Sequence, residues 1–279
     1  MGTVSTSYLS KTLDASNRKT WTFSTWLKIP SMIGDAQVIW ANSYAASSAN
    51  YAYIALTSTF NIEVQGVIGG GAAKVNIKTN RQLLDTTSWY HLVIRMDTTQ
   101  STAADRVRIY INGGDAETSF ATNVIPDQNQ DLGWQMNVEH RLGNFAGLNR
   151  NFYGLLAHTH FADGQSYAPS TFGETDSTTG EWKAKLNPSV TYGTNGFFLK
   201  YENSANFGLD SSGESNNMAT AGTFKQDTDT PSNNFMILDR NQAYEATVNG
   251  SDKVDHSGTA WLGTSGSAIG ANGTMMMAN

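Results

Sequence analysis

Two histidines one residue apart are the side chains best spaced to bind a metal ion in this chain. His158 and His160 flank a threonine, and Asp163 follows three residues after the second histidine. Side chains at positions i and i+2 of a strand share a face, so both imidazoles could meet one ion. The alternative is that the pair occupies the more polar face of an ordinary strand. There is no cysteine, which removes thiolate ligands and thiolate catalysis, and we predict no metal site.

Acid–base and nucleophilic catalysis find little support in the remaining residues. His91 follows Trp89 and Tyr90, and a packed position in a strand explains it better than a role as general base. Serine, histidine and aspartate are all present, but the chain contains no nucleophile-elbow motif. We therefore expect that the protein is not an enzyme.

Aromatic residues interleaved with small ones are the candidates for a binding surface. Carbohydrate binding needs aromatic platforms and a few well-placed polar groups. The residues that could provide such a surface are Trp40, Tyr44, Tyr51, Tyr53 and, in a glycine-rich loop, Trp134. Tyrosine and tryptophan are also enriched in protein interfaces and in cores. Core packing or an interface is the preferred explanation for this set.

Apolar residues alternate with polar ones in several stretches, which predicts half-buried strands. The stretches are 21–28, 61–65, 74–78, 90–96, 106–111, 153–161 and 197–201. Alternation with period two places one set of side chains on a core and the other in solvent. In the first stretch, Trp21, Phe23 and Leu27 are expected in the core, and Ser24 and Lys28 in water. Asn-Gly and Asp-Gly pairs at the stretch ends suit tight turns, so the pattern predicts an all-β sandwich or barrel.

The composition also favours strands over helices. Charged residues make up 15% of the chain, against about 25% in an average soluble domain, and Ser, Thr, Asn and 26 Gly carry the polar character. The net charge is −6, and no cluster of Lys and Arg stands out, so we expect no nucleic-acid partner. No apolar run approaches the length of a membrane span, so we expect no membrane partner.

The composition changes in the last third of the chain. Residues 1–202 are predicted to form the sandwich, whereas residues 203–279 are rich in Asn, Ser, Thr and Gly with few apolar anchors. We expect the second part to be an extended polar arm, partly packed on the sandwich or on a neighbouring subunit. A structureless polar tail is the competing interpretation.

Four sets of stretches together carry a family resemblance. They are 9–12 with 21–28; 89–93 with 97–100 and 105–113; 153–164; and 172–176 with 192–199 and 210–213. The first three sets resemble the concanavalin A-like, laminin-G-like lectin/glucanase superfamily. The full set, together with segment 229–235, resembles a subgroup found in virion structural proteins of tailed bacteriophages. The resemblance implies a jelly-roll β-sandwich of two antiparallel sheets, one of them concave.

The superfamily includes retaining glucanases, which carry Glu-x-Asp-x-x-Glu, or a form with one spacer fewer, along one strand. The nearest match is the stretch from Glu174 to Glu181, in which Asp176 is the second carboxylate. The required last Glu would stand at 178 or 179, and both positions are Thr. A retaining pair also needs carboxylates about 5 Å apart, whereas this stretch has the composition of a turn. The departure from the pattern argues against glycosidase activity.

Calcium is the ion that the resemblance makes most relevant. Lectin-like sandwiches often hold it at a sheet rim through aspartate and backbone oxygens. The loop candidates here are Asp97, Asp105 and Asp127. None shows a recognisable calcium-loop spacing, so solvated loop acids are the preferred explanation. We predict no cofactor and leave calcium open.

Taken together, the residues and the resemblance predict a non-enzymatic bacteriophage virion structural protein. It would be displayed on the particle surface, as capsid decoration or as a fibre- or tail-associated module, after synthesis in the host cytoplasm. Its expected partners are other virion proteins and further copies of itself, because parts of viral surfaces repeat by symmetry. The alternative is a host-attachment adhesin that binds host-surface glycans on the same fold.

Overall fold

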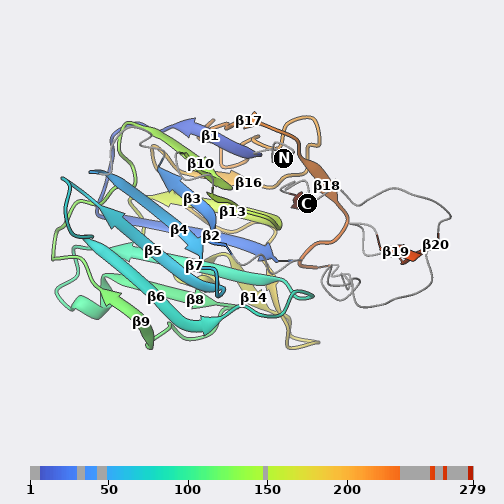
Figure 1. Cartoon of the computed structure of the whole chain (residues 1–279), viewed down its shortest axis with the longest axis horizontal. Helices are drawn as coiled ribbons and strands as arrows, with labels where there is room; N and C mark the ends of the chain where they lie inside the picture. The colour runs from blue at the N-terminus through green and yellow to red at the C-terminus, as the bar shows by residue number, and fades with distance from the viewer. Residues whose placement is uncertain are drawn as a thin grey trace.

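The computed structural model describes residues 7–29, 35–42, 49–146 and 150–232, together with three short strands nearer the C-terminus. The regular structure in these ranges is almost entirely β-strand (Figure 1). It includes two single-turn 3-10 helices, η1 (Ala103–Asp105) and η2 (Pro169–Thr171). In this part of the chain, no helix has the length and apolar character required to cross a bilayer. The predicted all-β fold class is confirmed.

One layer of the molecule is an eight-stranded antiparallel sheet. Its strands in spatial order are β17 (Ala219–Ala221), β1 (Tyr8–Thr12), β10 (Glu139–Leu142), β3 (Gln37–Asn42), β4 (Tyr51–Leu56), β5 (Asn61–Val67), β6 (Val75–Gln82) and β9 (Phe120–Val124). The strands from β3 to β6 follow one another along the chain, whereas β1, β10 and β17 come from distant segments. Such long-range pairing is typical of a jelly roll.

The second layer is a seven-stranded sheet. Its strands are β18 (Lys225–Asp227), β21 (Met276–Ala278), β13 (Leu155–Asp163), β2 (Thr20–Lys28), β7 (Tyr90–Asp97) and β8 (Val107–Ile111), with β16 (Phe197–Leu199) also paired to β13. Its pairs are antiparallel apart from those of β21, which runs parallel to both β13 and β18. The predicted sandwich of two antiparallel sheets is confirmed.

The two layers enclose a core rich in aromatic rings. Trp21 of β2 packs against Trp134, with 4.8 Å between the ring centroids. Trp40 of β3 packs against Phe161 and Phe197, at 5.9 and 5.5 Å. All five rings are buried, so they contribute the large apolar areas that drive the two sheets together. The apolar residues of the first predicted strand, Trp21, Phe23 and Leu27, thus lie in the core, as the alternation predicts.

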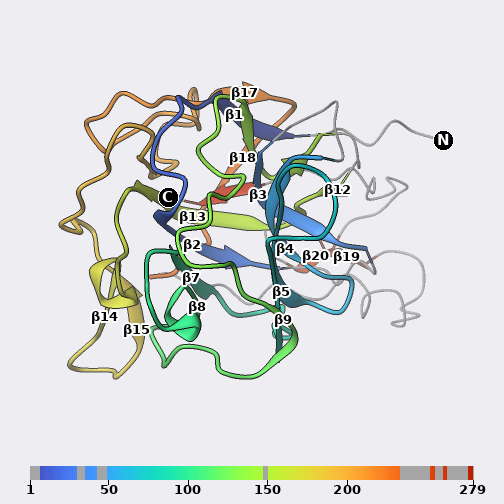
Figure 2. The same ribbon diagram turned by 90° about the vertical axis from the view of Figure 1, so that its left-hand side faces the viewer.

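The outer side of β2 in the seven-stranded sheet is also buried, which corrects the expectation that Ser24 and Lys28 lie in water. Both side chains belong to fully buried residues. The physical reason is that the chain after β13 folds back over this face. The Thr22 hydroxyl donates to the carbonyl of Gln165 at 2.8 Å, and a hairpin of β14 (Gly173–Thr175) and β15 (Trp182–Ala184) lies on the same side (Figure 2).

Two smaller two-stranded sheets complete the description. β11 (Asn144–Phe145) pairs with β12 (Arg150–Asn151) beside β3. Nearer the C-terminus, β19 (Asp252–Val254) pairs with β20 (Ala260–Leu262). The first of these hairpins brings Phe145 to the outer face of the eight-stranded sheet.

The polar segment that follows residue 202 begins as part of the sandwich. β17 pairs with β1 at the edge of the eight-stranded sheet. Close by, the Ser7 hydroxyl donates to the carbonyl of Thr223 at 2.8 Å and accepts from its backbone N–H at 3.1 Å. β18 forms the far edge of the other sheet. Residues 203–232 therefore pack on the sandwich of their own chain.

A buried ion pair fixes this segment to the covered face, and we call it the Lys28–Asp229 latch. The Lys28 ammonium lies 2.6 Å from Asp229 Oδ2, and the two side chains are 0% and 4% exposed. The Trp89 indole N–H donates to Asp229 Oδ1 at 2.8 Å. Both carboxylate oxygens therefore have donors, as a buried charge requires. The latch joins β2 and the start of β7 to a residue about 200 positions later in the sequence.

Breaking the latch should destabilise the whole sandwich. Asp229→Ala removes the acceptor of both Lys28 and Trp89, and loss of one partner of a buried pair costs about 3 kcal/mol. Urea unfolding followed by tryptophan fluorescence measures the change. Glu214→Ala, at an exposed acid in the same segment, is the matched control and should change stability by less than about 0.5 kcal/mol. Equal stability of the two variants would contradict the proposed role of the latch.

Candidate functional site

The outer face of the eight-stranded sheet carries a cluster of aromatic side chains. Tyr51 and Tyr53 stand two positions apart on β4 and therefore share a face. Their rings are stacked, with 6.1 Å between centroids and 7° between planes. Phe145 from β11 packs edge-on against both, at 6.2 and 5.9 Å. Tyr53 and Phe145 are buried, whereas Tyr51 is partly exposed, so the cluster presents Tyr51 to solvent.

The tyrosine hydroxyls organise the polar side chains of the neighbouring strand. Tyr53 Oη donates to Gln65 Oε1 at 2.7 Å and lies 3.2 Å from Glu63 Oε2. Tyr51 Oη reaches the same Gln65 oxygen at 3.3 Å. Burial raises the pKa of the Tyr53 hydroxyl, and the Glu63 carboxylate raises it further. Tyr53 therefore remains a neutral donor at physiological pH, and its bond orients the Gln65 amide.

Polar residues continue this surface across the sheet. Gln65 is in register with Asn76, and Glu63 with Lys78. All four are partly exposed, and beyond Asn76 the row ends at Val124, which is 43% exposed. We call this surface the tyrosine face; it consists of Tyr51, Tyr53, Phe145, Glu63, Gln65, Asn76 and Lys78. It combines aromatic rings with amide, carboxylate and ammonium groups, which together suit a polyhydroxylated ligand.

The other predicted aromatic residues do not join this face. Trp40 and Trp134 are fully buried in the core between the sheets. Their burial agrees with core packing, the preferred explanation, and excludes an exposed aromatic surface at these two positions. It follows from their ring contacts with Trp21, Phe161 and Phe197. Tyr44 lies outside the described residues. Of the five candidates, the structure brings together Tyr51 and Tyr53.

Glu63 and Gln65 were absent from the predicted site, although they complete it. The alternation assigns them only to a solvent-facing set. What makes them functional candidates is that Tyr53 lies opposite Gln65 in the β4–β5 register. Two residues in register on adjacent strands are neighbours, but the register of a hairpin is set by its turn geometry. The sequence signal that could have identified Glu63 and Gln65 is the pair of tyrosines, followed by a strand whose solvent-facing residues are polar.

Two of the three calcium candidates, Asp97 and Asp105, have side-chain partners within the protein. Asp97 Oδ1 accepts from the Thr99 hydroxyl and Oδ2 from Gln100 Nε2, both at 2.6 Å. Asp105 is paired with Arg108, and Asp127 is exposed in its loop. Among the described residues, no three His, Cys, Asp or Glu side chains are grouped so that they could hold a metal ion.

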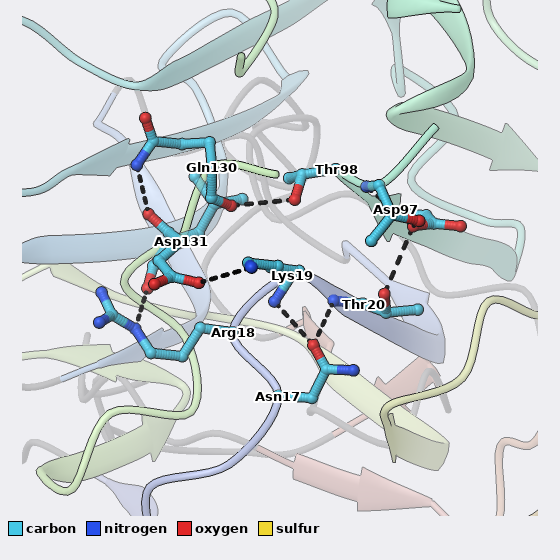
Figure 3. A network of polar contacts seen from close by, with 10 residues as sticks. Asn17, Arg18, Lys19, Thr20, Asp97, Thr98, Gln130 and Asp131 are labelled. Atoms are coloured by element: carbon cyan, nitrogen blue, oxygen red, sulfur yellow. Dashed lines mark hydrogen bonds and ion pairs between the residues drawn. The ribbon is translucent and has the colours of Figure 1, made fainter. Parts of the chain in front are cut away.

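Figure 3 shows that Asp97 belongs to a network of polar contacts that joins the start of β2, the end of β7 and the loop at Gln130. Its Oδ1 lies 3.4 Å from the Thr20 hydroxyl. The adjacent Thr98 hydroxyl donates to the carbonyl of Gln130 at 2.9 Å. Burial alone would raise the pKa of the Asp97 carboxyl, but hydrogen bonds from Thr99 and Gln100 outweigh it and lower the pKa. These hydrogen bonds explain why Asp97 is placed here: its carboxylate accepts hydrogen bonds that hold the surrounding structure.

The two closely spaced histidines lie on a bulge. The pairing of β13 with β2 shifts register between Ala157 and His160, and His158 adopts a positive φ of 46°. The bulge interrupts the regular i, i+2 geometry that a shared metal ligand set requires. His160 instead stacks on Phe198 at 3.9 Å, and its Nδ1 lies 2.9 Å from the Tyr192 hydroxyl. Burial lowers the pKa of His160, so it is neutral.

His91 is the histidine with a serine neighbour, and its tautomer can be assigned from its partners. The Trp182 indole N–H donates to His91 Nδ1 at 2.9 Å, and an indole can only donate. Nε2 therefore carries the proton and donates to the Ser24 hydroxyl at 2.9 Å. A general base would have to accept the serine proton at that nitrogen. In this arrangement His91 cannot activate Ser24.

The carboxylates between Glu174 and Glu181 lie in the β14–β15 hairpin. Asp176 accepts from the Lys183 ammonium at 2.8 Å and from the backbone N–H groups of Thr178 and Thr179 at 2.8 and 3.0 Å. Asp176 and Glu181 are joined by a backbone hydrogen bond of 2.7 Å that closes the turn. The stretch is therefore a turn, as its composition indicates, and its acids do not line one strand face.

The buried histidines should make the free energy of unfolding depend on pH at values above those at which carboxylates titrate. Burial lowers the pKa of His91 to about 3 and that of His140 to about 4, against 6.5 in the unfolded chain. The unfolded state then binds more protons below pH 6.5, so stability is complete above that pH and falls as the solution is acidified. Below pH 6.5 and above its pKa in the folded protein, each histidine lowers the free energy of unfolding by about 1.4 kcal/mol per pH unit.

We expect the free energy of unfolding to fall by more than about 2 kcal/mol between pH 7 and pH 5. Urea unfolding at several pH values measures it. His91→Gln keeps an acceptor for Trp182 but cannot titrate. Its pH dependence should be about three quarters as steep, because burial also lowers the pKa of His140, His158 and His160. A wild-type profile that is flat over this interval would show that the histidines are not held neutral.

Comparisons with known proteins agree with this architecture. A family model described as the concanavalin A-like lectin/glucanases superfamily matches residues 2–165. A search of curated proteins finds no match. The superfamily part of the resemblance is thereby confirmed.

Similar solved structures have low sequence identity. The native heptameric SAP-like pentraxin from Limulus polyphemus is 11% identical, with 69% of this chain and 91% of that chain covered and a TM-score of 0.44. Domains LG4-5 of the mouse laminin alpha1 chain are 12% identical, with 58% and 41% covered and a TM-score of 0.42. The Ruminococcus gnavus IT-sialidase CBM40 bound to alpha2,3 sialyllactose is 10% identical, with 49% and 70% covered and a TM-score of 0.35. Because the family model matches more than half of its length, the chain belongs to the concanavalin A-like lectin/glucanases superfamily.

Proposed function

We propose that this protein is a non-catalytic binding module on the surface of a bacteriophage particle, and that its ligand is carbohydrate. The observation that carries the ligand class is the hydrogen-bonded pairing of Tyr51 and Tyr53 with Gln65 on the tyrosine face. The Gln65 carbonyl oxygen is held by the two hydroxyls, and no partner for Nε2 is found within the described part of the chain. The amide N–H groups are thus oriented in advance for a ligand, which lowers the ordering cost of binding.

The non-catalytic part of the proposal is supported by the state of the groups that catalysis would use. His91 has its proton on the nitrogen that faces Ser24, so the pair lacks an available base. Asp176 is fully engaged within a turn. A glycosidase would need two carboxylates that flank the bond to be cleaved, whereas Asp176 and Glu181 are joined by a backbone hydrogen bond that closes a turn.

The virion setting is supported by the sequence resemblance of the four sets of stretches to phage structural proteins. In that setting the protein would contact other virion proteins and further copies of itself. A purely structural role, as capsid decoration or as a fibre- or tail-associated part, needs no ligand on the tyrosine face. The orientation of Gln65 by two tyrosines favours the adhesin over that role.

The carbohydrate proposal predicts that the tyrosine face is the binding surface. On an array of bacterial surface polysaccharides, Tyr51→Ala and Gln65→Ala should each weaken binding about tenfold, since each removes at least one contact worth about 1.4 kcal/mol. Tyr110→Ala is the matched control, because Tyr110 is a partly exposed tyrosine of β8 in the other sheet. Its binding should be unchanged.

Two outcomes would separate the parts of the proposal. Saturable binding that is insensitive to Tyr51→Ala and Gln65→Ala would place the sugar elsewhere on the molecule. No binding to any polysaccharide, together with gold-antibody labelling of intact phage particles in electron micrographs, would favour the structural role. The absence of label on intact particles would contradict the virion setting.

A further inference from the structure

The terminal strand β21 occupies an internal position in the seven-stranded sheet. It lies between β13 and β18 and runs parallel to both; Figure 2 shows it in red beside β13. Met276 is in register with Leu155 on one side and with Lys225 on the other. The spatial order contains no direct pairing of β13 with β18 among the described strands. The two strands thus enclose a slot one strand wide.

Both walls of this slot are fixed by residues that precede position 233. β13 pairs with β2 along its other edge, and its later half also pairs with β16. β18 is held by Gln226 Nε2, which donates to the carbonyls of Tyr201 and Glu202 at 3.3 and 3.1 Å. Two residues further on, the Lys28–Asp229 latch anchors the chain. Both walls of the slot are therefore held by contacts other than those with β21.

A slot of this kind needs a strand to fill it. Leu155 and Leu156 are fully buried, and the backbone N–H and C=O groups beside them would lose their partners if β21 were withdrawn. Unpaired buried backbone groups are costly, and an open strand edge pairs readily with any extended segment of suitable sequence. The walls consequently form a strand-acceptor site.

We propose that this site accepts the terminal strand of a second copy of the chain, so that neighbouring subunits exchange residues 276–278. Residues 233–275 lie between the anchored segment and β21, and a chain of that length can reach on the order of 100 Å when extended. An exchanged strand makes the same contacts as one in its own slot, so exchange costs little. Mass action then favours exchange wherever copies are crowded.

The absence of cysteine allows this exchange to be trapped by disulfides. Lys225→Cys and Met276→Cys are introduced into separate copies of the full chain, and one variant carries a longer tag. Paired strands lie about 4.8 Å apart, which is within the range that a disulfide spans. Lys225→Cys mixed with Ala278→Cys is the matched control, because position 278 is two residues out of register with position 225.

After mixing at high protein concentration and oxidation, we expect a mixed-tag dimer whose yield exceeds that of the out-of-register pair about fivefold. A chain that carries both Lys225→Cys and Met276→Cys reports closure within one copy. Crosslinking in that chain, with the mixture at the level of the control, would show that the strand remains in its own slot and would overturn the proposal. Failure of both to crosslink would show that the slot is not filled by this strand. Neither result depends on carbohydrate binding, so the two proposals stand or fall separately.

Discussion

The structure depends on one constraint, which is that β2 is buried on both of its faces. Its apolar set, beginning with Trp21, packs between the sheets, and its polar set, Ser24 and Lys28 included, lies under the chain that folds back over the sandwich. A strand in this position can keep polar side chains only if each has a partner. Thr22, Ser24 and Lys28 are bonded respectively to Gln165, His91 and Asp229.

This constraint determines the state of the groups that otherwise suggest catalysis. Trp182 covers the sheet by packing against Gly113 and Gly173, where any side chain would collide with its ring. In that position its indole N–H can reach His91 Nδ1. The same contact that seals the face thus fixes the tautomer and excludes water, so burial lowers the pKa of the imidazole. The hydrogen bond between His91 and Ser24 is therefore a consequence of how the outer side of the sheet is covered.

Much of the architecture could be predicted from the sequence, because alternation and turn residues report local geometry. The limits appear where a second layer covers a face. The alternation of β2 correctly places Trp21 in the core, but it assigns Lys28 to solvent because the partner, Asp229, lies about 200 residues away. Trp40 could be either a core or a surface residue on the sequence alone, because its strand is buried on both sides and has no alternation that would assign a face. Tyr51 and Tyr53 could be found from their spacing, whereas Gln65 required the pairing of β4 with β5.

The two outer faces of the sandwich consequently have different physical roles. The outer side of β2 and β13 in the seven-stranded sheet makes contacts within the chain, because the β14–β15 hairpin and the Lys28–Asp229 latch pack there. The eight-stranded sheet keeps partly exposed polar side chains across β5 and β6, beside an aromatic cluster that cannot shift because Tyr53 and Phe145 are buried. A ligand gains most from a surface whose groups are already oriented. Tyr51 and Gln65 combine rigid support from the buried rings with access to solvent, and this combination is the physical basis for proposing the tyrosine face as the contact surface.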